Sequence, residues 1–177
     1  SIWILNDAVW NSWFAVHIRY RKAGLNLHEN NILGEKIMSF NYKSLLPTPA
    51  QIKAEFPLTP ECVELKAARD KEVADVITGK SKKFLVIIGP CSADREDAVC
   101  EYMSRLAKVN EQVKDKLVIV PRVYTNKPRT TGGGYKGMLH QPDPEKKPNM
   151  YEGLVAIRKL HMRVIEDYGF TTADEML

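Results

Sequence analysis

Two runs of apolar, mostly branched residues set the strongest limit on what this chain can fold into. They are KFLVIIG, from Lys83 to Gly89, and KLVIVPRVY, from Lys116 to Tyr124. Nearly continuous apolar runs of this length are typical of strands buried on both faces, as in parallel sheets. The segment between them, from about Arg95 to Val113, has the periodicity of an amphipathic helix. Strand, helix and strand in this order predict a βαβ unit with a right-handed crossover.

Helix start signals extend this pattern in both directions. TPAQ at 48–51 has the form of a capping box with proline at the first helical position, and predicts a short helix that ends near Phe56. A second Thr-Pro pair predicts a helix over 60–78, and another helix is expected over 149–167, before a third strand within 170–177. The residues expected to be buried on the two later helices are Ala98, Val99, Tyr102, Leu106, Val109 and Val113 on the first, and Leu154, Ile157, His161, Val164 and Tyr168 on the second.

Alternating strands and helices predict an α/β fold. A closed barrel and an open doubly wound sheet both fit the pattern. In either architecture, ligands bind at the carboxyl ends of the strands.

Composition excludes several functional classes. The net charge of +4 is small and the basic residues gather on no single helix, so nucleic-acid binding is not indicated. No apolar stretch is long enough to span a membrane. Three scattered cysteines do not suggest a disulfide framework, which favours a reducing, cytoplasmic setting. Cys62 and Cys100 lie on predicted helices without metal-ligand spacing, and we interpret both as structural.

The N-terminal residues differ in character from the rest. All three tryptophans occur at Trp3, Trp10 and Trp13, a cluster that fits an interfacial amphipathic helix. From Met38 the composition becomes ordinary. We interpret 1–37 as a non-native or upstream extension, with a genuine partner-docking extension as the alternative. The remainder then divides into an N-terminal helical segment, 38–81, and the βα units of 82–177.

Chemically active side chains gather where the predicted strands end. Cys91 follows the first strand, Arg122 lies near the end of the second, and Lys127 and Arg129 come directly after it. Closely spaced cations repel one another unless an anion lies among them, and arginine forks match phosphate and carboxylate. These residues predict an anion site. The alternatives are a structural ion pair for Arg122, a flexible basic connector for the loop, and an inert core position for Cys91.

Other polar residues near these strands have weaker indications. Thr130 could donate a hydroxyl hydrogen bond, and the following glycines let backbone N–H groups approach an anion. His161, on an apolar helix face, is interpreted as a core histidine, and His140 as a solvated loop residue. By strand alternation one of Asp174 and Glu175 points inward, and the sequence alone does not say which.

Four segments, in this order, resemble the type I 3-deoxy-D-arabino-heptulosonate 7-phosphate (DAHP) synthases: IIGPCS, PRVYTNKPRTT, YKGMLHQP and ADEML. The resemblance covers about Met38 to Leu177. KPRTT is its most specific part, whereas GPCS also occurs in the related octulosonate 8-phosphate synthases. The resemblance implies the N-terminal part of a (β/α)8 barrel. It also implies cytoplasmic homo-oligomers that condense phosphoenolpyruvate with erythrose 4-phosphate, the first step of the shikimate pathway, with a divalent metal of the Mn, Fe, Zn or Co class.

The resemblance also implies roles for individual residues. Arg122 and Lys127 match residues that bind phosphoenolpyruvate, and Arg129 and Thr130 match residues that hold the sugar phosphate. Cys91 matches a metal ligand. Glu175 matches a carboxylate beside the phosphoenolpyruvate and the metal-bound water, so the catalytic residues implied are Lys127 and Glu175.

Family members are considerably longer than this chain, and their other metal ligands lie on later strands. We therefore expect an incomplete barrel without synthase activity of its own. The alternatives to the DAHP synthase reading are a non-catalytic module that binds an anion or a partner, and the octulosonate 8-phosphate synthase, against which KPRTT argues.

Overall fold

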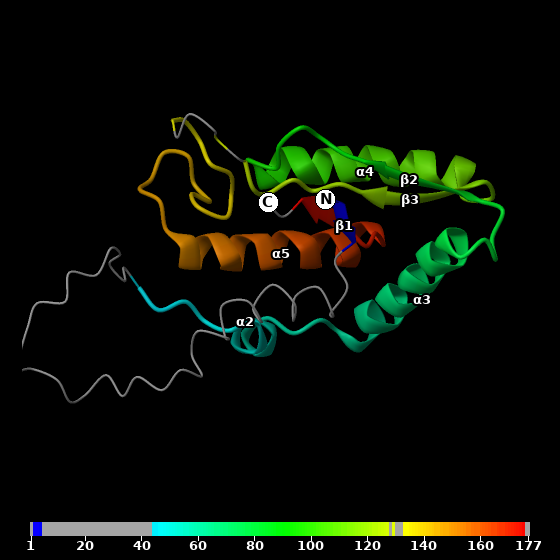
Figure 1. Cartoon of the computed structure of the whole chain (residues 1–177), viewed down its shortest axis with the longest axis horizontal. Coiled ribbons are helices and arrows are strands. Elements are labelled where there is room, and N and C mark those ends of the chain that lie inside the picture. The colour runs from blue at the N-terminus through cyan, green and yellow to red at the C-terminus, as the bar shows by residue number, and fades with distance from the viewer. Residues whose placement is uncertain (1, 5–43, 128, 130–132, 176–177) are drawn as a thin grey trace, which may run out of the picture.

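The computed structural model of the chain describes residues 2–4, 44–127, 129 and 133–175, and only the backbone at 2–4 and 175. The elements in chain order are β1 (Ile2–Ile4), α2 (Pro49–Glu55), α3 (Pro60–Ile77), β2 (Phe84–Ile88), α4 (Glu96–Val113), β3 (Leu117–Pro121), α5 (Met150–Tyr168) and β4 (Ala173–Glu175). Helices α4 and α5 lie together beside a small sheet, and α3 lies apart from them (Figure 1).

The predicted βαβ unit is confirmed. Strands β2 and β3 pair in parallel, with Phe84 opposite Leu117. Strand β4 continues the sheet on the other side of β3 through a parallel bridge between Arg122 and Ala173. The order β2-β3-β4, with α4 and α5 as the connections, is the start of an α/β fold, and the described strands do not close into a barrel.

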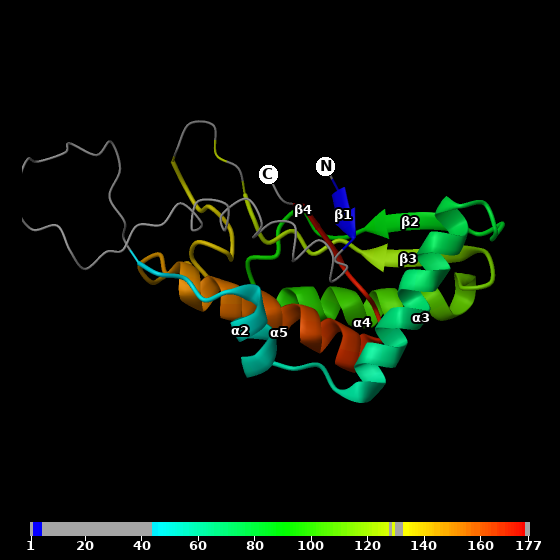
Figure 2. The same cartoon turned by 60° about the horizontal axis from the view of Figure 1, so that its bottom comes forward.

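The two faces of the sheet are covered by different helices. Helices α4 and α5 lie side by side against one face, and α3 crosses the opposite side near the amino ends of β2 and β3 (Figure 2). In β3, Ile119 belongs to the cluster with α4 and α5, whereas Val118 and Val120 pack with Val73 of α3. This two-sided burial explains the continuous apolar run of β3. Strand β2 is the edge strand, and its Phe84 is 75% exposed.

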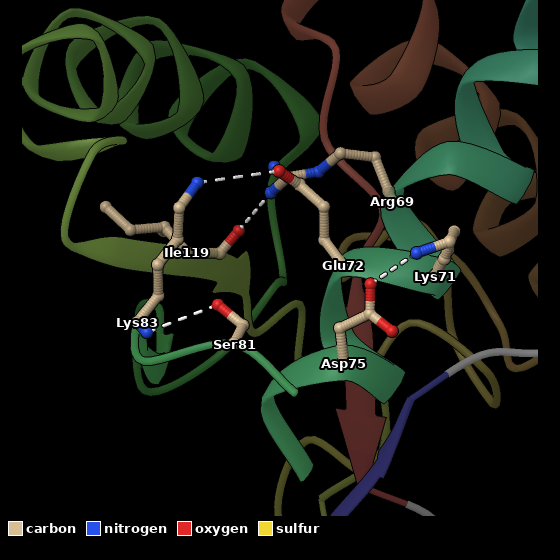
Figure 3. Close-up of polar contacts among 7 residues, drawn as sticks. All are labelled: Arg69, Lys71, Glu72, Asp75, Ser81, Lys83 and Ile119. Atoms are coloured by element: carbon tan, nitrogen blue, oxygen red, sulfur yellow. Dashed lines mark hydrogen bonds and ion pairs between the residues drawn. The ribbon is translucent and has the colours of Figure 1, made fainter. Parts of the chain in front are cut away.

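Helix α3 is attached to the sheet by a charged hydrogen bond as well as by apolar contact. Nη2 of Arg69 donates to the backbone oxygen of Ile119 over 2.6 Å, and Nη1 pairs with Glu72 over 2.7 Å (Figure 3). Lys83, just before β2, reaches the same Glu72 carboxylate at 3.8 Å. The Arg69 guanidinium also lies 5.9 Å from the ring centre of Phe170, which is fully buried. Arg69 therefore links α3, β3 and the approach to β4.

The predicted helix termini are confirmed by their capping contacts. Thr48 and Gln51 form the reciprocal capping box at the start of α2. Thr59 accepts from the backbone N–H of Cys62 at the start of α3. Gly169 ends α5 at φ 69°, a left-handed conformation that glycine adopts without strain.

The predicted buried face of α4 needs correction. On α4, Val109 is 48% exposed and Ala98 is also exposed, while Cys100 and Met103 are buried instead. On α5 the predicted face is confirmed, since Leu154, Ile157 and Val164 are buried and Leu160 adds to it. The helical periodicity of α4 was predicted correctly, but its buried face is turned toward Cys100 and Met103 because α4 packs against both the sheet and α5. Cys62 and Cys100 are buried free thiols, as expected of structural cysteines.

The predicted helix at the N-terminus is wrong where it can be compared, and the interpretation of 1–37 as an extension stays a prediction. Residues Ile2–Ile4 form a strand, β1, that pairs antiparallel with β4, so Trp3 is not in a helix. Trp10 and Trp13 lie outside the described residues. Among the described helices, none combines the length and apolar character that a membrane crossing requires.

Candidate anion-binding site

The carboxyl ends of β2 and β3 meet through a glycine. A Cβ atom at Gly89 would lie 1.8 Å from the backbone oxygen of Arg122, so only glycine allows this approach. The chain then turns through Pro90, whose backbone oxygen accepts a 3.0 Å hydrogen bond from Nη1 of Arg122. The turn ends at Cys91, an exposed free thiol. Local chain geometry thus brings the end of one strand against the end of the next.

Three of the predicted site residues come together here around a tyrosine. The Arg122 guanidinium lies 4.2 Å from the ring centre of Tyr124, and Nζ of Lys127 lies 5.3 Å from the same centre. Nζ of Lys127 also donates to Sγ of Cys91 over 3.3 Å. Both cations are within the distance at which an aromatic ring attracts a positive charge. We call Cys91, Arg122, Tyr124 and Lys127 the cation cluster.

The segment that carries the cation cluster is held to the β2 side by backbone hydrogen bonds. The N–H of Arg122 donates to the oxygen of Ile88 over 2.8 Å. Two residues on, the oxygen of Tyr124 accepts from the N–H of Ala93 over 2.8 Å. Tyr124 is only 7% exposed, so its ring presents a fixed surface to the two cations.

The β4 side of the same segment is held by one backbone bond and then by a side chain. The N–H of Val123 donates to the oxygen of Ala173 over 2.7 Å. The N–H of Thr125 donates to Oδ1 of Asp174 over 3.1 Å, and its hydroxyl donates to Oδ2 of the same carboxylate. Thr125 and Asp174 are each 2% exposed. Asp174 is therefore the inward-pointing carboxylate that alternation had left undecided.

A histidine lies behind this carboxylate. Nδ1 of His161 is 2.6 Å from the hydroxyl oxygen of Thr172, and Nε2 is 3.9 Å from Oδ2 of Asp174. Burial lowers the pKa of His161 from 6.5 to about 4, and the positive charge of Arg158 acts in the same direction. His161 is therefore neutral at pH 7. The sequence-based reading of a core histidine agrees with its 11% side-chain exposure.

The loop after Lys127 folds back onto the same segment. The N–H of Lys127 donates to the oxygen of Lys136 over 3.0 Å. Gly137 has φ 98°, and a Cβ atom there would lie 2.4 Å from the oxygen of Thr125. Nε of Arg129, which is exposed, donates to the oxygen of Tyr135 over 2.9 Å. The loop thereby returns to the cation cluster, with Arg129 hydrogen-bonded to the loop itself.

The remaining predicted site residues fall at the limits of the described chain. Thr130 lies outside the described residues. Glu175 is described as part of β4 by its backbone alone. Their predicted roles stay predictions.

The described residues do not make a metal site. They contain no group of three His, Cys, Asp or Glu side chains placed to hold a metal ion. Cys91 supplies one thiol, and its described neighbour is the ammonium group of Lys127 rather than a second ligand. The metal-ligand role of Cys91 therefore stays a prediction.

Sequence reasoning missed two features of this site. Tyr124 was not selected, although it stands between the two cations in RVYTNK, where a ring can reach both. The Thr125–Asp174 contact joins residues 49 positions apart, and no local pattern indicates it.

Comparison with known proteins agrees with these motifs. The profile described as "DAHP synthetase I family" matches residues 51–177. A Phe-sensitive phospho-2-dehydro-3-deoxyheptonate aldolase from Escherichia coli is 38% identical over 135 residues, which cover 76% of this chain and 38% of that protein. The Tyr-sensitive enzyme from the same organism is 36% identical over 135 residues, with 76% and 37% covered.

A solved structure extends the agreement to the fold. The phospho-2-dehydro-3-deoxyheptonate aldolase from Francisella tularensis superposes with a TM-score of 0.70 at 31% identity, over 77% of this chain and 39% of that one. The chain thus spans well under half the length of the relatives that it matches. Since the matching profile covers most of the chain, this protein belongs to the DAHP synthetase I family.

Proposed function

We propose that this chain provides the phosphoenolpyruvate-binding part of a DAHP synthase, the enzyme that begins the shikimate pathway to the aromatic amino acids. The observation that carries the proposal is the pair of cations, Arg122 and Lys127, gathered on one tyrosine ring at the carboxyl edge of the sheet. Ligands of α/β folds bind at this edge. Membership of the family supports the choice of substrate.

The charge and shape of phosphoenolpyruvate suit this cluster. The molecule carries a carboxylate and a phosphate close together. A guanidinium binds either group through two parallel hydrogen bonds, and an ammonium acts as a point charge. Arg122 and Lys127, which lie near the same ring, repel each other. A bound dianion attracts both cations, and this attraction outweighs their repulsion.

The proposed reaction joins phosphoenolpyruvate to erythrose 4-phosphate. C3 of phosphoenolpyruvate attacks the aldehyde carbon, water adds at C2, and the C2–O bond to phosphate then breaks to release inorganic phosphate. In this scheme Arg122 and Lys127 bind and orient the first substrate. Arg129 and Thr130 hold the sugar phosphate, and Glu175 supplies the carboxylate near the reacting atoms.

Members of the family generally use a divalent metal ion. Cys91 is the thiol at the edge of the cluster and is the ligand we propose. A single thiol does not fit a complete metal site, so we assign no step of the reaction to the metal. We further propose that the protein acts in the cytoplasm and that its longer form is a homo-oligomer.

Binding of phosphoenolpyruvate to the 177-residue chain tests the site directly. Isothermal titration calorimetry would compare the wild type with Arg122→Ala and Lys127→Ala. Loss of one charge-assisted hydrogen bond is expected to weaken binding about tenfold or more. The matched controls are Arg105→Ala and Lys114→Ala, two exposed cations of the α4 region that pair with Glu101 and Glu111. Equal affinity in all five proteins would contradict the assignment.

A hybrid enzyme tests the reaction itself. Residues 51–177 would replace the matching segment of the Phe-sensitive Escherichia coli relative, and the hybrid would be assayed for phosphate release. The proposal expects release with erythrose 4-phosphate as the second substrate. Activity only with arabinose 5-phosphate would favour the octulosonate 8-phosphate synthase instead. A folded hybrid that binds phosphoenolpyruvate but releases no phosphate with either sugar would favour a non-catalytic binding module.

A further inference from the structure

The bonding between β3 and β4 changes from backbone to side chain at the candidate site. The last described backbone hydrogen bond between the two strands is the one from the N–H of Val123 to the oxygen of Ala173. Alternation makes Thr125 the next residue to face β4. Its N–H does not donate to a strand oxygen but to Oδ1 of Asp174, and its hydroxyl donates to Oδ2. One carboxylate therefore holds both donors of one residue.

We infer that Asp174 is a positioning residue, whose buried carboxylate anchors Thr125 and thereby holds Tyr124 and Lys127 in the geometry that binds the substrate anion. This inference rests on the proposed function for its ligand. Asp174 acts through Thr125 and is not assigned contact with the reacting atoms.

The place of the anchor along the chain supports this role. Thr125 lies directly after Tyr124 and two residues before Lys127. On the β2 side, the last described backbone bond of this segment is at Tyr124, and on the β4 side the anchor is at Thr125. The next described backbone bonds are from Leu139 to the oxygen of Thr125, over 3.3 Å, and from Lys127 to the oxygen of Lys136, both to residues of the loop. Among the described contacts, the anchor is thus the last that ties the chain to β4 before it enters the loop.

Burial makes the anchor rigid. Thr125 and Asp174 are each 2% exposed, and a carboxylate removed from water keeps its charge only when donors satisfy it. Two donors from the same residue fix both the position and the rotation of that residue. Behind the carboxylate, the contact of His161 with Thr172 ties α5 to the chain that enters β4.

The alternative is that the Thr125–Asp174 contact contributes only to the stability of the whole fold. The two explanations predict that hydrogen exchange would increase in different parts of the protein. A general loss of stability raises hydrogen exchange throughout the cooperative core, including α4 and α5, whereas loss of an anchor raises it locally.

Thr125→Val is the informative variant, because it removes the hydroxyl and keeps the shape of the side chain. Thr125→Ser restores the hydroxyl. Thr171→Val is the matched control, since Thr171 is also a buried threonine, on the approach to β4, and its hydroxyl has no hydrogen-bond partner in the described structure. Each protein would be compared with the wild type by hydrogen–deuterium exchange and by calorimetric titration with phosphoenolpyruvate.

The anchor predicts that Thr125→Val exchanges about tenfold faster within residues 122–127, with α4 and α5 unchanged. It also predicts phosphoenolpyruvate binding about tenfold weaker, a loss of the size expected when a hydrogen bond to a charged group is removed. Thr125→Ser and Thr171→Val should stay close to the wild type in both measurements.

Three results would overturn the inference. They are unchanged local exchange in Thr125→Val, an increase spread equally over α4 and α5, and faster local exchange with wild-type affinity. If the wild-type chain binds no phosphoenolpyruvate, the proposed function fails, and the exchange comparison still decides whether Asp174 is the anchor of this loop.

Discussion

Lowering the pH from 7 to 4 is predicted to destabilise this protein through one buried side chain, His161. Its folded-state pKa is about 4, below the ordinary value of 6.5, because burial penalises the charged ring and Arg158 repels it. As the pH falls, the unfolded chain therefore binds a proton before the folded chain does. The stabilising contribution of His161 is complete above pH 6.5 and is lost progressively toward pH 4.

The size of the effect follows from the same two values. The difference between 6.5 and about 4 corresponds to about 3 kcal/mol of unfolding free energy. His161→Asn provides a form that does not titrate and can keep a contact with Thr172 from a similar position. Many carboxylates also titrate over this range, so the quantity of interest is the difference between the wild type and the variant.

Urea unfolding followed by circular dichroism at pH 7, 5.5 and 4 would measure it. The wild type should lose about 3 kcal/mol more than His161→Asn between pH 7 and pH 4. His140→Asn is the control for removing a histidine from a loop. The Asp174 carboxylate, 3.9 Å from Nε2, favours the charged ring and opposes the effect of burial. If that attraction prevails, the wild type will lose less stability than the variant, and the reasoning from burial is refuted.

Three further predictions concern the candidate site and the chain as a whole. Gly89→Ala should destabilise the fold by about 2–4 kcal/mol in urea unfolding, because its Cβ would overlap the backbone oxygen of Arg122. Gly133→Ala, whose Cβ would have no atom of the described residues within 4 Å, should be neutral. Tyr124→Leu should weaken phosphoenolpyruvate binding about tenfold in calorimetric titration, because two cations lose the aromatic ring, and Tyr124→Phe, which keeps the ring, should bind more tightly than Tyr124→Leu. The 177 residues alone, supplied with both substrates and Mn²⁺, should release no phosphate above background, because three parallel strands leave β2 as an open edge. Product formation well above background would show that these residues form a complete catalytic unit.

Features that depend on residues close together in the chain could be predicted from the sequence. The apolar run of β3 and the periodicity of α4 identified strand, helix and strand, because burial on two faces and burial on one face leave different spacings. The helix N-caps at Thr48 and Thr59 could be predicted from the sequence because an N-cap contact joins residues that are three positions apart. The proximity of Cys91, Arg122 and Lys127 was also predictable, because the strand ends of a parallel sheet meet at one edge.

The contacts that each of these residues makes depend on how the whole chain packs. Periodicity predicted that α4 has a buried face, but Val109 is exposed because the direction of that face depends on how α4 packs against the sheet and α5. Alternation could not choose between Asp174 and Glu175, and Asp174 became the buried carboxylate when β4 was laid beside Thr125. The ring of Tyr124 lies near both Arg122 and Lys127 because of the path that the chain takes after β3. These contacts join residues from separate elements or across a turn, and their energy depends on distances that only the packed chain defines.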